Sequence, residues 1–116
     1  MTTAEADNVN EVCLLGRVSG QPQRRVLPSG DVMVSIRIVV PRPASRRRPR
    51  GATVDTLDCV AWLSRPRNVL ERLRPADAVQ VRGALRRRFW RGERGTASKV
   101  EVEVLHAKRL RRPPAE

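Results

Sequence analysis

Aromatic side chains are scarce in this sequence: its 116 residues include two tryptophans, one phenylalanine and no tyrosine. A folded core must therefore be built mainly from Val, Leu, Ile and Ala. Acidic residues are also few, 12 against 24 basic ones, which leaves a formal net charge of +12. Such an excess of positive charge predicts a polyanionic partner.

Long apolar runs and basic amphipathic helices are missing as well, so a nucleic acid is favoured over an acidic membrane surface as that partner. The opening residues MTTAEADN lack the charged and apolar regions of a secretory signal, and we expect a cytoplasmic, nucleoid-associated protein. Cys13 and Cys59 have no metal-ligand spacing, and His106 is the single histidine. We expect buried, reduced thiols, no metal and no cofactor.

Catalytic side chains show no recognisable arrangement. Asp55 and Asp58 lie three residues apart in a predicted strand, which places them on opposite faces. The sequence contains no Ser/His/Asp set and no glycine-rich phosphate loop. We therefore expect a binding protein rather than an enzyme.

The chain does contain apolar residues at alternate positions, which is typical of β-strands. Five strands are predicted, at residues 12–18, 32–40, 54–63, 78–90 and 97–105. A short helix fits between the third and fourth strands, with Ser64 as its N-cap and Pro75 as its end. Gly16 and Gly83, inside strands, predict bends or bulges. This order favours an all-β, five-stranded Greek-key barrel, the OB-fold, over another small barrel or sandwich.

Composition also predicts the limits of the domain. Residues 1–9 are polar and are expected to be disordered. Residues 10–110 contain all the predicted strands and form the OB-fold domain. Residues 111–116 are expected to be a short basic and proline-bearing tail.

A basic and aromatic segment ends the fourth predicted strand. It carries Arg86, Arg87 and Arg88, followed at once by Phe89 and Trp90. Guanidinium groups for phosphates and aromatic faces for unpaired bases are what a surface for single-stranded nucleic acid requires. Neighbours in a strand point to opposite faces, so alternation places Trp90 with Arg86 and Arg88. We expect Trp90 to stack on bases and Phe89 to pack in the core or a subunit interface; an ordinary exposed basic hairpin is the alternative.

Further arginines are candidate phosphate ligands. The loop at residues 41–52 is rich in proline and arginine, and it contains Arg46, Arg47, Arg48 and Arg50. Arg17 and Arg37 lie inside strands, where an arginine needs either a groove that binds a partner or a paired carboxylate. Trp62 shares a strand face with Asp58 and is expected to pack in the core or between subunits.

Three segments resemble those of bacterial single-stranded DNA-binding proteins: NEVCLLGRV at residues 10–18, LPSGDV at 27–32 and VQVRGALR at 79–86. The resemblance covers roughly residues 8 to 110. It implies an OB-fold assembled as a homotetramer, and sequence-independent binding of single-stranded DNA in replication, repair or recombination. It also assigns Trp90 a base-stacking role.

The departures from that family are specific. Leu57 and Leu63 stand where the family commonly has aromatic residues. The loop at residues 41–52, which usually carries another aromatic residue in the family, is rich in arginine here. The long linker and acidic tip at the C-terminus are missing, so the chain resembles a short accessory paralogue, with a tailed paralogue as a further possible partner. We expect a binder that relies on phosphate contacts, with Leu57 and Leu63 as candidate base contacts. The alternative is a dimeric replication-restart interaction module resembling PriB, which binds strands weakly.

Overall fold

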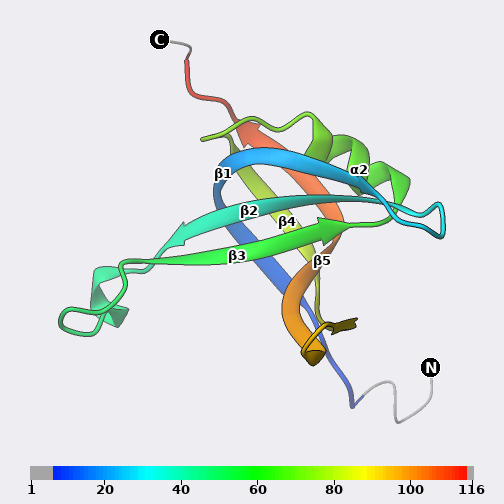
Figure 1. The fold of residues 1–116 in the computed structure, drawn as a ribbon. Coiled ribbons are helices and arrows are strands. Elements are labelled where there is room, and N and C mark those ends of the chain that lie inside the picture. The colour runs from blue at the N-terminus through cyan, green and yellow to red at the C-terminus, as the bar shows by residue number, and fades with distance from the viewer. Residues whose placement is uncertain (1–6, 115–116) are drawn as a thin grey trace.

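Five strands close into a barrel in the order β1-β2-β3-β5-β4, with β4 pairing back to β1 (Figure 1). The computed structural model describes residues 7–114. Its strands are β1 (Val12–Val26), β2 (Val32–Pro41), β3 (Val54–Ala61), β4 (Ala78–Gly92) and β5 (Gly95–Arg111). All neighbours pair antiparallel except β3 and β5, which are parallel. With the helix α2 (Ser64–Glu71) between β3 and β4, this is the predicted OB-fold.

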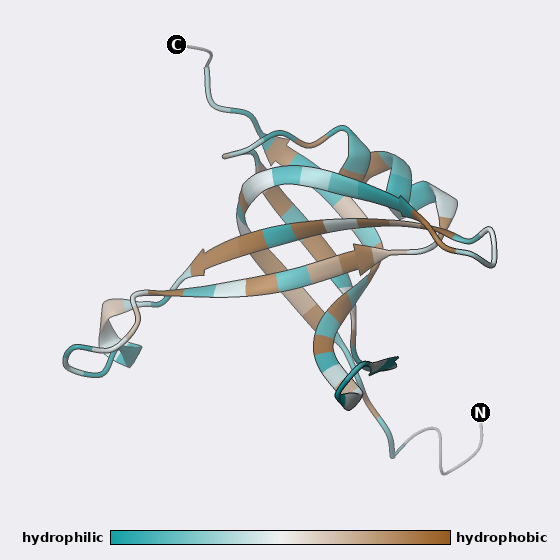
Figure 2. Ribbon diagram, viewed as in Figure 1, coloured by the Kyte–Doolittle hydropathy of each residue, from teal (hydrophilic) through white to brown (hydrophobic). Residues whose placement is uncertain are grey.

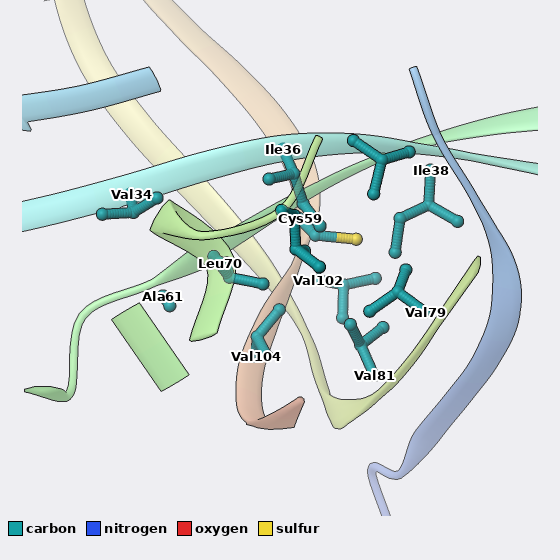
Figure 3. Packing of buried hydrophobic residues seen from close by; sticks show 12 residues of the cluster. Val34, Ile36, Ile38, Cys59, Ala61, Leu70, Val79, Val81, Val102 and Val104 are labelled. Carbon is teal, nitrogen blue, oxygen red and sulfur yellow. The ribbon is translucent and has the colours of Figure 1, made fainter. Parts of the chain in front are cut away.

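Alternate residues of the strands fill the barrel, and Leu70 of α2 packs among them (Figure 3). Figure 2 shows the resulting apolar bands along the strands and polar residues at the outlying loops. The core side chains are Val18, Val34, Ile36, Ile38, Cys59, Ala61, Leu70, Leu73, Val79, Val81, Val102 and Val104. None of them is aromatic, as the composition predicts.

The two glycines inside strands lie where backbones approach closely. A Cβ on Gly83 would lie 1.7 Å from the carbonyl oxygen of Glu103, at the point where the β4–β5 register shifts. This confirms the predicted bulge. A Cβ on Gly16 would lie 2.5 Å from the carbonyl oxygen of Val39, so Gly16 allows β1 to pass close to β2.

Three strands are longer than predicted. β1 continues to Val26 after an irregularity between Ser19 and Gln23, where Gly20 adopts a φ of +78°. β4 and β5 extend to a tight turn at Gly92 and Gly95. These extensions are mostly exposed on both faces, so they carry no apolar alternation to reveal them.

The helix starts one residue earlier than predicted. Leu63 is the N-cap and makes no side-chain capping bond, so the prediction of Ser64 as the cap is wrong. Pro66 and Leu70 are buried against the barrel. The helix ends at Glu71, before Pro75, as predicted.

Arg112, the first residue after β5, forms hydrogen bonds with the turn between α2 and β4. Its guanidinium lies 3.0 and 3.1 Å from the two carboxylate oxygens of Asp77 and donates to the Arg72 carbonyl oxygen. Asp77 is fully buried and also accepts the backbone N–H of Arg74. The barrel contacts therefore reach two residues past the predicted domain end at 110.

At the other terminus, the Asn10 side chain extends the pairing of β1 with β4. Its amide nitrogen donates to the Leu85 carbonyl oxygen (2.8 Å), and its oxygen accepts the Leu85 N–H (2.9 Å). Residues 7–9 are exposed and have no strand. The rest of the segment predicted to be disordered, residues 1–6, lies outside the described residues, as do residues 115–116 of the predicted tail.

Candidate nucleic-acid interface

The ends of β4 and β5 form a two-stranded ribbon that reaches away from the barrel, and Figure 1 shows its tip at the bottom of the view. Alternation gives this ribbon two faces. The tryptophan face carries Arg86, Arg88 and Trp90 of β4, opposite Glu101, Lys99 and Ala97 of β5. The phenylalanine face carries Leu85, Arg87 and Phe89, opposite Val102, Val100 and Ser98.

On the tryptophan face, Arg88 contacts the ring of Trp90. The guanidinium carbon lies 5.4 Å from the ring centroid, within cation–π range, and Trp90 is 44% exposed. Arg88 Nε also lies 3.0 Å from Oε1 of Glu101, a nearly buried carboxylate. The Arg88 Nε–H does not form a hydrogen bond with Glu101, so the two groups are paired by their opposite charges.

Arg86 is also paired with a carboxylate, in its case by a hydrogen bond. Its Nε donates to Oε1 of Glu103 at 3.0 Å. The structure thus brings Arg86, Arg88 and Trp90 together, in agreement with the alternation. It also adds two carboxylates, Glu101 and Glu103, that pair with these guanidiniums.

A polar hollow of about 430 Å³ lies beside this face, on the outside of β1, β2 and β3. Arg37 Nε donates to Asp58 Oδ1 at 3.1 Å, and Lys99 Nζ lies 2.9 Å from Asp58 Oδ2. The hydrogen bond from Lys99 is the largest cause that lowers the pKa of Asp58. Arg37 therefore both lines a groove and has a paired carboxylate.

Arg17 lies elsewhere. It pairs with Ala78 at the start of β4 and donates to the Ala76 carbonyl oxygen at 3.1 Å. This position is at the opposite end of β4 from Trp90. The structure does not bring Arg17 together with the ribbon tip.

The β2–β3 loop projects to the left in Figure 1 and holds the short 3-10 turn η1 (Ala44–Arg46). Its four predicted phosphate ligands are all exposed: Arg46, Arg47, Arg48 and Arg50. Arg47 donates to the Arg42 carbonyl oxygen at 2.9 Å. Within residues 7–114, none of the four forms an ion pair, so their charge is available to a ligand.

Arg42 explains why no carboxylate within residues 7–114 pairs with the four loop arginines. The sequence interpretation did not identify Arg42 as part of the site. Its Nε and Nη2 donate to Oδ1 of Asp55 at 3.0 and 2.7 Å. Asp55 is an acidic residue at the foot of the loop, and this bond occupies it. This contact depends on how β2 pairs with β3, which the sequence alone does not show.

Leu57 and Leu63, the two leucines predicted to contact bases, lie in different places. Leu57 pairs with Ile38 and is half-buried, on the side of β3 that faces the barrel interior. Leu63 is 57% exposed and lines hollows beside α2 with Trp62, Arg67 and Val69. Neither lies on the β3 face of Asp58, the face that carries Arg37 and Lys99.

The sequence analysis places Phe89, Trp62 and the two cysteines in buried positions, and the structure agrees with this only in part. Phe89 is 63% exposed, so its assignment to the core is wrong: the ribbon has left the barrel at this point. Cys13 is exposed on β1, whereas Cys59 is buried as predicted. Trp62 is half-buried beside the β1–β2 turn.

Residues 7–114 show neither a metal-ligand cluster nor a membrane-spanning helix. These residues contain no group of three or more His, Cys, Asp or Glu side chains suited to a metal ion. No helix among them has the length and apolar character needed to cross a bilayer.

Comparison with solved structures supports the fold. The Plasmodium falciparum SSB in complex with ssDNA matches with a TM-score of 0.69 over 88% of this chain and 93% of that one. Sequence identity to it is 19%, so this likeness concerns the fold.

Curated relatives match more closely in sequence, and each is called a single-stranded DNA-binding protein. The Deinococcus radiodurans protein is 31% identical over 103 residues, covering 85% of this chain and 34% of its own length. The Bacillus cereus protein is 32% identical over 98 residues, covering 84% of this chain and 56% of its own. This chain thus spans between a third and just over half of these relatives.

The pattern of the Single-strand binding protein family matches residues 9–110. That range begins just before Asn10 and ends one residue before the end of β5, so it includes the β2–β3 loop, the ribbon and all of the barrel except Arg111. The match agrees with the resemblance noted in the three strand and turn segments. The chain therefore belongs to the single-strand binding protein family.

Proposed function

We propose that this protein binds single-stranded DNA without sequence preference, through arginine–phosphate contacts and limited base stacking. The observation that carries the proposal is the coincidence of two features outside the barrel. One is the exposed Trp90 ring with Arg88 against it, and the other is the β2–β3 loop with four arginines free of carboxylates. Stacking and phosphate neutralisation are the two components of single-strand binding.

The contacts proposed for DNA follow from the charges. The loop arginines Arg46, Arg47, Arg48 and Arg50 are the main phosphate ligands, because no carboxylate holds them. Arg37, Arg86 and Arg88 contribute less, because each is already paired with a carboxylate.

Three residues make the least contribution to the proposed surface. Leu57 is half-buried on the interior side of β3, Leu63 lies beside α2, and Arg17 lies at the base of β4. Each is separated from the ribbon tip by the topology of the barrel.

The wider assignments rest on the family. We propose a non-enzymatic role in DNA replication, repair or recombination, at the nucleoid in the cytoplasm. We propose a homo-oligomer, a tetramer or a dimer, with a tailed family member as a further partner. Membership of the single-strand binding protein family is what supports these proposals.

A second function is favoured by one observation. Three of the predicted arginines, Arg37, Arg86 and Arg88, are each neutralised by a carboxylate. Together with leucine at positions 57 and 63, this weakens strand binding and favours a replication-restart module that bridges proteins.

An anisotropy titration with labelled oligo-dT, competed by matched duplex and RNA, decides between the two functions. Tight binding that duplex fails to displace supports the single-strand binder. Weak, indiscriminate binding that added salt abolishes supports the bridging module, and sedimentation would then show a dimer. A variant with all four loop arginines changed to Gln should bind oligo-dT more weakly than the wild-type protein, because these arginines are the main phosphate ligands proposed.

A further inference from the structure

The phenylalanine face of the ribbon carries an exposed apolar strip. Leu85 is 48% exposed, Val100 is 47% exposed and Phe89 is 63% exposed. The strip begins where Leu85 pairs with the buried Val102 and continues outward along the ribbon. Because Phe89 stands clear of the barrel, its ring contributes little to the stability of the fold.

The charges on this face differ from those on the tryptophan face. Arg87 donates to the hydroxyl oxygen of Ser98 at 3.2 Å, a neutral partner. Arg91 follows Phe89 at the next position on the same face, opposite Thr96. Within the described residues, no carboxylate pairs with Arg87 or Arg91, whereas Glu103 and Glu101 pair with Arg86 and Arg88.

Arg87, Phe89 and Arg91 therefore form a repeat of guanidinium, aromatic ring and guanidinium along one strand. Alternate residues of a strand lie roughly 7 Å apart, which leaves room for a base on the ring with phosphates at either side. Trp90 is less exposed than Phe89, and one of its neighbouring arginines is held by Glu101.

We propose that Phe89 is a second base-stacking residue and that Arg87 and Arg91 bind the flanking phosphates. The ribbon then presents one ring on each face to unpaired bases, which offsets the loss of aromatic residues at positions 57 and 63. This inference rests on the proposed binding of single-stranded DNA. A second copy of this chain is a poorer occupant of the strip. Arg87 and Arg91 of one copy would lie close to the same arginines of the other copy, and their positive charges would repel.

The test compares Phe89→Ala with Trp90→Ala in anisotropy titrations with labelled oligo-dT. We expect Phe89→Ala to weaken binding at least fivefold, and Phe89→Tyr to restore it, with the midpoint of thermal unfolding unchanged. Wild-type affinity in Phe89→Ala would overturn the inference. Failure of the wild-type protein itself to bind would instead overturn the proposed function.

Two further readouts separate base stacking from other roles. In a Trp62→Phe, Trp90→Phe background, we expect the emission of Phe89→Trp to be quenched when oligo-dT is added. Arg87→Gln should make the salt dependence of binding shallower than Arg86→Gln does. If Phe89→Ala changed the sedimentation of the free protein and left DNA binding intact, the strip would be a subunit interface, and the inference would be wrong.

Discussion

Arg88 lies between a ring and a carboxylate: its guanidinium carbon is 5.4 Å from the centroid of Trp90, and its Nε is 3.0 Å from Glu101. Glu101 is 6% exposed, so water screens this pair little. The carboxylate orients Arg88 beneath the ring, and it also competes with any phosphate for the same guanidinium.

Replacing Glu101 by Gln should therefore strengthen the binding of single-stranded DNA. The change removes one negative charge at nearly constant shape and frees Arg88 for phosphate. We expect a several-fold gain in affinity for oligo-dT and a salt slope steeper by about 0.7, the increment of one added phosphate contact on a single strand. Anisotropy titrations at four salt concentrations measure both quantities.

Glu93→Gln is the control for that experiment. Glu93 is exposed at the ribbon turn and forms no ion pair within the described residues, yet its replacement changes the net charge by the same amount. An equal gain in the two variants would show that the effect comes from overall charge and not from the Arg88 pair.

The buried pair of Asp77 and Arg112 predicts a loss of stability in acid. The hydrogen bond from Arg112 is the main cause that lowers the pKa of Asp77 in the folded protein. A carboxylate with a lowered pKa stabilises the fold above its unfolded pKa of about 3.9, and the effect disappears as pH falls towards the folded value. Urea unfolding at pH 7, 4 and 3 should show decreasing stability.

Asp77→Asn tests the origin of that acid sensitivity. The variant should be less stable at pH 7 by about 1.5–3 kcal/mol, because hydrogen bonds to a charged group are lost. Its stability should also fall less between pH 7 and pH 3 than that of the wild-type protein. Asp58, whose pKa is also lowered, remains in the variant and accounts for part of the residual dependence. An unchanged pH profile would contradict the assignment to Asp77.

The two thiols should differ in reactivity. Burial raises the pKa of Cys59 to about 12, so the reactive thiolate is almost absent at neutral pH, whereas Cys13 is exposed. We expect one thiol per folded chain to react with a disulfide reagent at pH 8, and two after unfolding in guanidinium. Cys13→Ser should abolish the reaction of the folded protein; a reaction that persists would show that Cys59 is accessible.

The barrel could be predicted because every second residue of its walls is apolar, as in Val34, Ile36 and Ile38. The same alternation correctly placed Trp90 with Arg86 and Arg88 and opposite Phe89. It could not show where β4 leaves the barrel, so the core position predicted for Phe89 is wrong, while its alternative place in a subunit interface stays a prediction.

The ion pairs of the site could not be read from the sequence. Glu101 and Glu103 lie opposite Arg86 and Ala84 only because the β4–β5 register shifts at Gly83. A shift of one residue would move both carboxylates to the other face of the ribbon. Contacts between distant segments, such as Arg42 with Asp55, likewise depend on how strands pair.

An interface built on the loop arginines is tested by the salt dependence of oligo-dT binding, measured for the wild-type protein and for the variant with Gln at positions 46, 47, 48 and 50. Each arginine–phosphate contact on a single strand contributes about 0.7 to the slope of log affinity against log salt. We predict a steep slope for the wild-type protein and a slope shallower by up to about 3 for the variant. Tight binding that survives high salt, with the same shallow slope in both proteins, would contradict an interface that relies on loop arginines.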